Sequence, residues 1–395
     1  MKITYILSAP QMAVFLRGQI LTMKASGFSP YIFSPLVTEE VQKIACEEGA
    51  DLILSPMVRN ISLWHDLVST LRLTRQLWKL KPEIVIAIGP KAGLLGGIAA
   101  CCAGVPCRIQ TKWGIRLETA RGLLRFILTL ADKIASACAQ IVLCDSQSGR
   151  TRTIELGLAS PTKVKVIASG SSKGIDINHF ARNEGTIEAA SRLRAEIGAS
   201  AGTPIVGFIG RLNRDKGLKE LTSTWLTIRA QRPDALLLVV GPSECESAEE
   251  LRLLHELQQA PGVRIIGERK NILPIYAAID VLLMPTHREG FPNVVLEASA
   301  FSIPTTGFKV TGMLDAVVDG ATGALVDFGD TDRLAQKTLT YLSDSNLRKQ
   351  HGENARARAI ECFQPATLWR GYFEIFKELA EGNDLSTYHL KWRLN

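Results

Sequence analysis

Two glutamates eight residues apart mark the second half of the sequence, because one of them stands in an apolar run. Glu297 lies within VVLEASAF (294–301), and Glu289 precedes that run in the loop-like THREGFP (286–292). Burying a carboxylate without a partner costs on the order of several kcal/mol, so Glu297 is expected to bind something. A carboxylate can accept hydrogen bonds from both hydroxyls of a sugar diol, whereas the structural alternative is a salt bridge to a buried arginine.

A basic loop earlier in the same half could hold an anion. RLNRDKG (211–217) joins the strand-like PIVGFIG to the helix-like LKELTSTWLTIRA and carries Arg211, Arg214 and Lys216. A helix N-terminus attracts anions through its unpaired N–H groups and its dipole. The loop does not have the Walker A pattern, so a phosphate site and a solvated basic loop both stay open here.

A second helix start lies between the two glutamates. Pro292 stands where a first helical residue is favoured, which leaves the amides after Gly290 available for an anion. Glu289 and Glu297 can then face one cleft from either side of that anion. The arrangement predicts a ribose on one side and a hexose on the other.

Short apolar runs that alternate with helix-like stretches must position these residues. Such alternation is typical of parallel sheets covered by helices on both faces, with ligands beyond the carboxyl ends of the strands. The sequence thus predicts an α/β fold of two doubly wound Rossmann-like domains that face each other across a cleft. We expect an acceptor-binding domain over 1–185, a donor-binding domain over 186–361 and a C-terminal helical segment, 362–395, that packs back on the first. The expected strands are 3–8, 29–35, 50–55, 83–89, 107–111, 140–146, 163–169, 204–210, 235–241, 263–267, 280–285 and 302–308.

Composition excludes several classes of protein. No run of 18 apolar residues is present, which argues against a transmembrane helix, and the start of the chain lacks the pattern of a secretory signal. None of the eight cysteines forms a CxxC or Cys/His spacing, so buried reduced thiols in a reducing cytosol are expected. Asp330 and Asp332 in DTD are better interpreted as a helix cap than as a metal site.

Positive charge is concentrated in the first half. Residues 1–180 contain 21 lysines and arginines against 12 acids, whereas the whole chain carries a net charge of +7. An acidic partner of that half is therefore expected: anionic lipid, a phosphorylated acceptor or nucleic acid. RLTRQLWKLK (72–81) and KWGIRLETARGLLRFILTLADK (112–133) mix basic and apolar residues, which suits either an anionic membrane or core helices with a wet basic side.

The second half resembles the retaining family-4 glycosyltransferases of the GT-B fold, through GFIGRLNRDKG (207–217), VGP and the stretch from IIGERKN to GALV (265–326). Glu289 and Glu297 match the family's Glu-x7-Glu pair. The first half resembles the bacterial surface-polysaccharide members more loosely, through GPKAGLLGGIAACCAGVP (89–106), WGIRLETARGLLR (113–125) and GSSKGIDINHF (170–180).

The resemblance implies roles for individual residues. Arg211 and Lys216 would hold the donor diphosphate, Glu297 the nucleotide ribose and Glu289 the donor sugar, which makes Arg211, Lys216 and Glu289 the catalytic set. Further donor contacts would come from Gly290, Phe291, Pro292 and, in the base-lining loop 267–270, Arg269. On the acceptor side the candidates are Lys91, Lys112, Trp113 and Arg116; Trp113 stands where related sequences often carry histidine.

The resemblance also implies the reaction. A hexose or N-acetylhexosamine would pass from a nucleotide sugar, UDP being favoured over GDP, to an undecaprenyl-diphosphate-linked saccharide with retention, in polysaccharide biosynthesis such as that of capsule or O-antigen. The expected enzyme needs no cofactor and no metal, binds no nucleic acid, and works in the cytoplasm, in peripheral contact with the anionic inner face of the cytoplasmic membrane. A non-hydrolysing nucleotide-sugar epimerase and a non-catalytic binding protein of the same fold are the alternatives.

Overall fold

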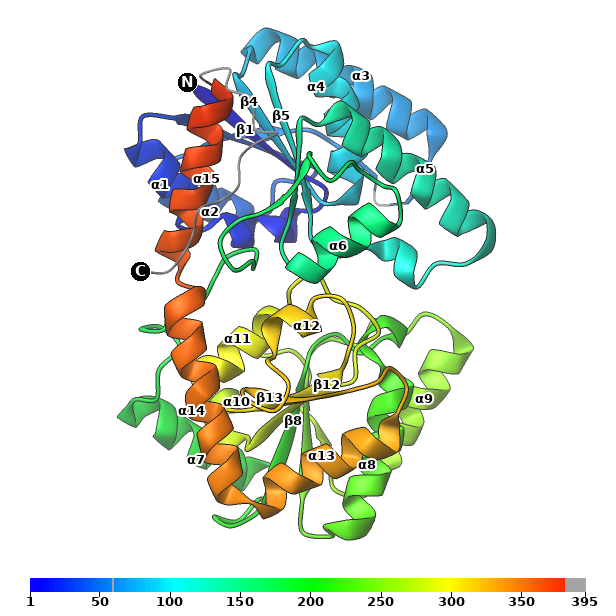
Figure 1. Ribbon diagram of the computed structural model, residues 1–395, viewed down its shortest axis with the longest axis vertical. Coiled ribbons are helices and arrows are strands. Elements are labelled where there is room, and N and C mark those ends of the chain that lie inside the picture. The colour runs from blue at the N-terminus through cyan, green and yellow to red at the C-terminus, as the bar shows by residue number, and fades with distance from the viewer. Residues whose placement is uncertain (59, 381–395) are drawn as a thin grey trace. The chain divides into compact units, whose positions relative to one another are not determined.

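The computed structural model describes residues 1–58 and 60–380, and it divides into two compact units (Figure 1). The first unit runs from Met1 to Lys173 and takes up the chain again from Pro365, and the second runs from Gly174 to Gln364. Each unit is an α/β layer structure built on one parallel sheet.

The sheet of the first unit has seven parallel strands in the order β3-β2-β1-β4-β5-β6-β7. Along β4, Ile84, Ile86 and Ile88 face one core cluster and Val85 and Ala87 face another, so both faces of the sheet are covered. The strands are β1 (Lys2–Leu7), β2 (Ser29–Ser34), β3 (Asp51–Leu54), β4 (Ile84–Ile88), β5 (Cys107–Lys112), β6 (Ile141–Cys144) and β7 (Val164–Val166).

Seven α-helices and three helical turns of other types surround that sheet in the described part of the unit. The helices are α1 (Gln19–Ala25), α2 (Glu39–Glu48), α3 (Leu63–Leu80), α4 (Gly97–Cys102), α5 (Gly122–Cys138), α6 (Gln147–Glu155) and α15 (Pro365–Ala380). The turns are η1 (Pro10–Leu16), η2 (Ala92–Gly96) and η3 (Arg116–Glu118). Leu368, Trp369, Tyr372, Ile375 and Phe376 of α15 are buried in the core cluster that also contains β1.

The sheet of the second unit has six parallel strands in the order β10-β9-β8-β11-β12-β13. They are β8 (Ile205–Ile209), β9 (Leu236–Val240), β10 (Val263–Ile265), β11 (Val281–Met284), β12 (Thr305–Phe308) and β13 (Gly323–Val326). Its helices are α7 (Glu184–Glu196), the turn η4 (Arg214–Lys216), α8 (Leu218–Gln231), α9 (Ala248–Gln259), α10 (Leu273–Ala278), α11 (Asn293–Ala300), α12 (Met313–Ala316), α13 (Thr331–Ser343) and α14 (Ser345–Cys362).

The α/β fold and all twelve expected strands are confirmed, but β13 was missed. Its four residues, GALV, contain only three apolar side chains and follow a glycine-rich turn, so they do not stand out from their surroundings. The division between the units also comes earlier than residue 185. Ile175 already belongs to the core of the second unit.

Residues 184–196, in the polar stretch where the expected domains meet, form helix α7. The Asn183 side chain accepts a hydrogen bond from the amide of Thr186 and so caps α7, whose Ala190 and Leu193 are buried in the core of the second unit. The C-terminal segment contributes α15 to the first unit as far as Ala380, and the remainder of 362–395 lies outside the described residues.

The structure also bears on the predictions about the cysteines and about transmembrane helices. Cys107 and Cys144 are buried, but Cys46, Cys101 and Cys102 are exposed, so the prediction that most of the thiols are buried was wrong. Among the helices of the described residues, none has the length and apolarity to cross a bilayer.

Candidate active site

The candidate donor-binding residues lie in loops at the switch point of the sheet of the second unit. Strands β8 and β11 are hydrogen-bonded neighbours there, and the chain order reverses between them. The basic loop follows β8, and the loop with Glu289 follows β11, so both emerge from the carboxyl ends of adjacent strands. In open α/β sheets this is the place where ligands bind.

Two glycines allow these loops to touch. Gly217 has φ +75°, and a Cβ there would lie 1.8 Å from the carbonyl oxygen of Pro285. Gly312 has φ +79°, and its Cβ would lie 2.3 Å from the carbonyl oxygen of Gly290. Only glycine fits at such close approaches in this left-handed region. The loops after β8, β11 and β12 are therefore held in direct backbone contact.

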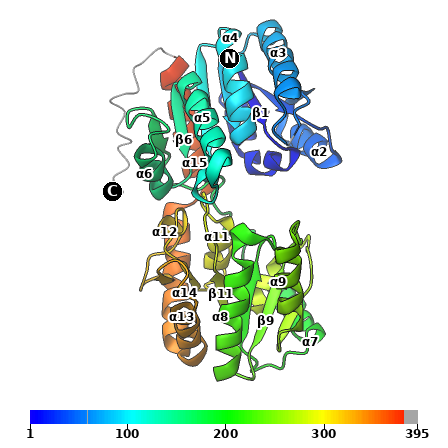
Figure 2. The same cartoon turned by 90° about the vertical axis from the view of Figure 1, so that its right-hand side faces the viewer.

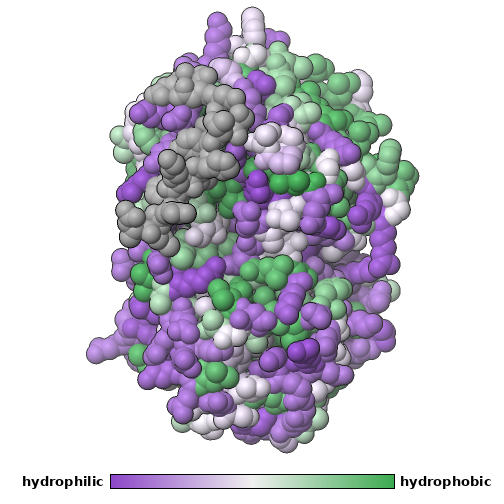
Figure 3. Space-filling view, in the orientation of Figure 1, coloured by the Kyte–Doolittle hydropathy of each residue, from purple (hydrophilic) through white to green (hydrophobic). Residues whose placement is uncertain are grey.

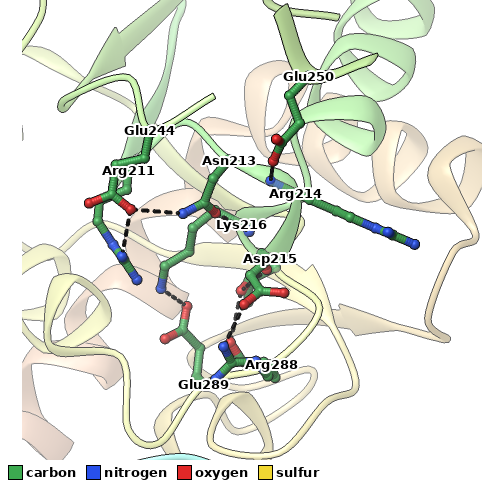
Figure 4. Close-up of polar contacts among 10 residues, drawn as sticks. Arg211, Asn213, Arg214, Asp215, Lys216, Glu244, Glu250, Arg288 and Glu289 are labelled. Atoms are coloured by element: carbon green, nitrogen blue, oxygen red, sulfur yellow. Dashed lines mark hydrogen bonds and ion pairs between the residues drawn. The ribbon is translucent and has the colours of Figure 1, made fainter. Parts of the chain in front are cut away.

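The two cations of the basic loop lie side by side and each meets an acid (Figure 4). Lys216 Nζ is 2.5 Å from Glu289 Oε1, and the Glu289 side chain is only 10% exposed. Arg211 pairs instead with Glu244 Oε2 at 2.7 Å, and its side chain is 48% exposed. The structure therefore brings Arg211, Lys216 and Glu289 together, as the sequence predicted, and adds a second acid.

Arg214, the third cation of the loop, points away from this group (Figure 4). Its backbone amide donates to Glu250, which anchors the loop to the first turn of α9. Asn213 caps η4 by accepting from the amide of Lys216, and its side-chain amide donates to Glu244. In this loop Arg214 therefore has a structural role, whereas Arg211 and Lys216 lie together on another side.

Ion pairing also joins the two loops on their other side. Arg288 Nη2 lies 2.5 Å from Asp215 Oδ2, and the amide of His287 donates to the carbonyl of Asp215. His287 Nε2 lies 3.0 Å from Glu220 Oε2. Burial acts to raise the pKa of Glu220, but hydrogen bonds, first from His287 and then from the backbone, lower this pKa below its usual value.

Glu297 is buried on α11, and its partner is a tyrosine. The hydroxyl of Tyr276, on α10, donates to Glu297 Oε2 at 2.7 Å. Burial, and then the negative charge of Glu297, raises the pKa of Tyr276 well above its usual value, so the hydroxyl keeps its proton. The Tyr276 ring stacks on Phe301 at 5.7 Å between centroids, which fixes its position.

The start of α11 differs by one residue from the expectation. Pro292 has ψ 102°, so it is the capping residue and the helix begins at Asn293. Phe291 is buried against Phe363, with ring centroids 5.1 Å apart, and carries the turn between Gly290 and the helix. Arg269 does not join the group around Lys216. Its guanidinium lies 3.2 Å from Glu196 on α7.

The acceptor-side candidates belong to the first unit, where most of them surround one pocket at the carboxyl ends of β4 and β5. Lys112, Trp113 and Arg116 line it, together with Leu128, Ala131 and Asp132 from α5. The Lys112 side chain is 4% exposed and pairs with Asp132 at 2.9 Å. Lys91 is not among the lining residues; it pairs with Asp66 of α3 at 2.7 Å.

Comparisons with known proteins agree with this arrangement. Residues 190–358 match the family described as glycosyl transferases group 1, and residues 12–170 match the glycosyl transferase 4-like domain. The chain is 32% identical to the capsular polysaccharide biosynthesis glycosyltransferase CapM of Staphylococcus aureus, over 96% of this chain and 99% of CapM. The chain is a family-4 glycosyltransferase of the GT-B fold, of the bacterial surface-polysaccharide type.

Other relatives are more distant. The transferase is 26% identical to an Escherichia coli UDP-Gal:alpha-D-GlcNAc-diphosphoundecaprenol alpha-1,3-galactosyltransferase, over 78% of each chain. Its fold matches that of HepE from Anabaena, solved in complex with UDP, with a TM-score of 0.77 and 21% identity over 96% of this chain and 100% of HepE. It also matches WaaG, a glycosyltransferase involved in lipopolysaccharide biosynthesis, with a TM-score of 0.69 and 16% identity over 94% of this chain and 99% of WaaG.

Sequence reasoning missed three residues that position the site of the transferase. Asn213 could have been recognised, because it precedes a short helical turn as capping residues do. Glu244 and Tyr276 carry no local signal. Glu244 lies in the loop after β9, and Tyr276 lies on a mostly apolar helix, so only the tertiary fold brings them to Arg211 and Glu297.

Asp330 accepts a hydrogen bond from the amide of Arg333 and begins α13, so the prediction of a helix cap at DTD is confirmed. Within residues 1–58 and 60–380, no group of three His, Cys, Asp or Glu side chains is arranged to hold a metal ion.

Replacing Tyr276 with phenylalanine is expected to destabilise the transferase by about 1–3 kcal/mol, because a buried carboxylate loses a hydrogen bond. Urea denaturation measures the loss. In the Glu297→Gln background, the same Tyr276→Phe change should cost less. Equal costs in both backgrounds would show that the two side chains are not coupled.

Proposed function

We propose that this transferase moves a hexose or N-acetylhexosamine from a UDP-sugar to a lipid-diphosphate-linked saccharide with retention at the anomeric carbon, without a metal ion. The observation that carries the proposal is the parallel placement of Arg211 and Lys216 at the switch point, with Glu289 against Lys216. Cleavage of a nucleotide sugar develops negative charge on the diphosphate. Cations that are already oriented stabilise such charge, because no reorganisation is needed when the bond breaks.

The ion pairs of the site are the contacts that a bound diphosphate would replace. Glu244 and Glu289 compensate Arg211 and Lys216 in the structure, which keeps two neighbouring cations from repelling each other. A diphosphate would take over the compensation of both cations. Glu289 would then be available to accept hydrogen bonds from donor-sugar hydroxyls, which a carboxylate does well.

Glu297 would bind the ribose of the donor. Tyr276 donates to its Oε2 and keeps the carboxylate in one orientation on α11. Gly290, Phe291 and Pro292 lie between the two glutamates in the sequence and would carry the phosphate and sugar contacts through their backbone. Arg269, paired with Glu196, would contribute through the backbone of loop 267–270 beside the base.

UDP is the favoured nucleotide and a diphosphoundecaprenol-linked saccharide the favoured acceptor. Support comes from the E. coli relative, whose name states a UDP-sugar donor and a diphosphoundecaprenol-linked acceptor, and from HepE, which was solved with UDP and with UDP-glucose. In this chain, Lys112, Asp132 and Arg116 line the pocket of the first unit, and because Asp132 pairs with Lys112, Arg116 supplies the net positive charge that would attract a diphosphate. Trp113, 5.1 Å from Phe15 between ring centroids, offers an aromatic face in the same pocket.

Exchange of alanine for Lys216 or Arg211 should reduce kcat about 10²–10³-fold, the usual effect of removing one preorganised donor. Arg214→Ala is the matched control, because Arg214 lies in the same loop but points away (Figure 4), and it should change kcat less than about twofold. Turnover is followed as UDP release in the presence of acceptor. Equal losses in all three variants would contradict the assigned roles.

The same assay separates the alternatives. A non-catalytic binding protein would bind UDP in a thermal-shift screen but would release none from a UDP-sugar in any variant. An epimerase would change the sugar and leave the acceptor unmodified.

Incubation with EDTA should leave turnover unchanged within error, because Arg211, Lys216 and the helix N-termini supply the positive charge. The measurement compares initial rates before and after chelation and after addition of manganese. Loss of most of the activity on chelation, restored by manganese, would overturn the metal-free mechanism.

The product should have the anomeric configuration of the donor, because the acceptor hydroxyl is proposed to attack from the face of the leaving group. One-dimensional ¹H NMR of the first product formed gives the anomeric coupling constant. Inversion at that carbon would contradict the proposed stereochemistry while leaving the donor site intact.

A further inference from the structure

Helices α3 and α5 of the first unit expose far more apolar surface than the other helices. Twelve of the 25 exposed large hydrophobic side chains in the described residues belong to these two helices. Trp64 is 70% exposed, Trp78 65% and Phe126 67%. Single exposed apolar residues are ordinary, but a contiguous group of this size marks a contact surface.

The exposed residues of α3 form a stripe opposite its packed face. Ser69, Leu73 and Leu77 are buried and recur every four residues, as expected for the side that packs on the unit. The spacing of Trp64, Leu67, Val68, Leu71 and Trp78 places them on the other side of the helix, where a soluble helix normally carries polar residues.

Helix α5 repeats this pattern. Its buried residues are Ala135 and Ser136. The exposed side carries Leu123, Phe126, Ile127, Leu130 and Ile134 at spacings of three and four residues.

The two stripes belong to one side of the unit. Both α3 and α5 contact α4, and Figure 2 shows α3, α4 and α5 side by side. The space-filling view shows hydrophobic residues gathered over α3 and α5 with hydrophilic ones among them (Figure 3). We name this surface the α3–α5 face, defined by Trp64, Leu67, Val68, Leu71, Trp78, Leu123, Phe126, Ile127, Leu130 and Ile134.

The charge of the face is positive. Arg72, Arg75 and Lys79 on α3, and Lys133 on α5, are exposed, and Arg125 is exposed in the first turn of α5.

Each helix contains a single acid, and each acid is already neutralised from within the unit. Asp66 pairs with Lys91, and Asp132 pairs with Lys112. Neither acid of the two helices is therefore available to neutralise the cations that remain exposed at the surface.

We infer that the α3–α5 face docks on an anionic lipid bilayer. Tryptophan and phenylalanine favour the interface of a bilayer, and exposed arginine and lysine attract anionic headgroups. A second copy of the chain fits less well, because a symmetric contact would bring the same cations against one another without acids to pair them. The docking itself does not depend on the reaction, whereas its meaning for the acceptor rests on the proposed function.

The consequence of docking for the acceptor follows from the residues on the two sides of α5. Leu128, Ala131 and Asp132 line the pocket with Lys112 and Arg116, while Leu130 and Ile134 face outward. One helix therefore borders both the acceptor-side pocket and the docking surface. A diphosphate-linked saccharide whose lipid stays in the bilayer would reach the pocket alongside this helix.

Flotation of the full chain with vesicles tests the docking. The wild type should float with phosphatidylglycerol–phosphatidylcholine vesicles and at least tenfold less with phosphatidylcholine alone. Phe126→Ser with Leu130→Ser, and separately Arg72→Glu with Lys133→Glu, should each weaken binding at least tenfold. The control, Leu226→Ser with Leu251→Ser, removes similarly exposed residues, 48% and 53%, from the second unit and should bind like the wild type.

Native fluorescence gives a second readout that does not depend on mutation of α5. Emission from Trp64 and Trp78 should be quenched by brominated lipid in anionic vesicles, and Trp64→Phe with Trp78→Phe should abolish that quenching. The inference is wrong if the wild type does not float, or if the control loses binding as the face variants do. It is also wrong if light scattering shows a dimer that the face variants dissociate.

Transfer assays distinguish the docking from the proposed function. The Phe126→Ser, Leu130→Ser variant should keep its turnover on a short-chain, water-soluble diphosphate-linked acceptor and lose at least tenfold on the long-chain acceptor in vesicles. Flotation without transfer to either acceptor would sustain the docking and refute the proposed reaction. Transfer to both acceptors without flotation would do the reverse.

Discussion

The contact between Gly217 and Pro285 fixes the loops at the switch point of the second sheet of this transferase. A Cβ at Gly217 would lie 1.8 Å from the carbonyl oxygen of Pro285, so the turn that begins α8 presses directly on the end of β11. Lys216, the residue before this glycine, is thereby held beside Glu289, four residues after that proline. Gly312 presses in the same way on Gly290. The backbone contacts between the loops therefore determine where the charged residues lie. They bring Lys216 and Glu289 close enough to form an ion pair.

The charged side chains of this site have partners before a ligand arrives. Arg211 has Glu244, Lys216 has Glu289, and Glu297 has the hydroxyl of Tyr276. The two ion pairs let Arg211, Lys216, Glu244 and Glu289 stand close together without the cost of isolated buried charge. A ligand with a diphosphate between two sugars offers the same partners in exchange, anionic oxygens for the cations and hydroxyls for the acids. Binding can then proceed as a replacement of partners.

The sequence predicted the fold well where the pattern was local. Buried parallel strands are continuous apolar runs, so twelve of them were found, and the four-residue β13 was too short to be distinguished. The grouping of Arg211, Lys216 and Glu289 was also accessible, because their loops follow strands that could be recognised. The partners Glu244 and Tyr276 were not, because strand order decides which loops meet, and no residue near them records it. Helix α7 did not stand out in the sequence, because only two of its three buried residues, Ala190 and Leu193, are apolar.

The ion pair between Lys112 and Asp132 connects the pocket of the first unit with its outer face. Asp132 is the single acid of α5, and its pairing with Lys112 turns it inward. The pairing leaves Arg125 and Lys133 as the exposed charged groups of α5, and Asp66 with Lys91 leaves only cations exposed on α3. Lys112 and Lys91, which the sequence predicted as acceptor contacts, therefore also keep the charge of the outer surface of α5 and α3 positive. A helix with a paired acid beneath and an apolar, basic stripe outside is suited to lie between an anionic membrane and the pocket proposed for an anionic acceptor.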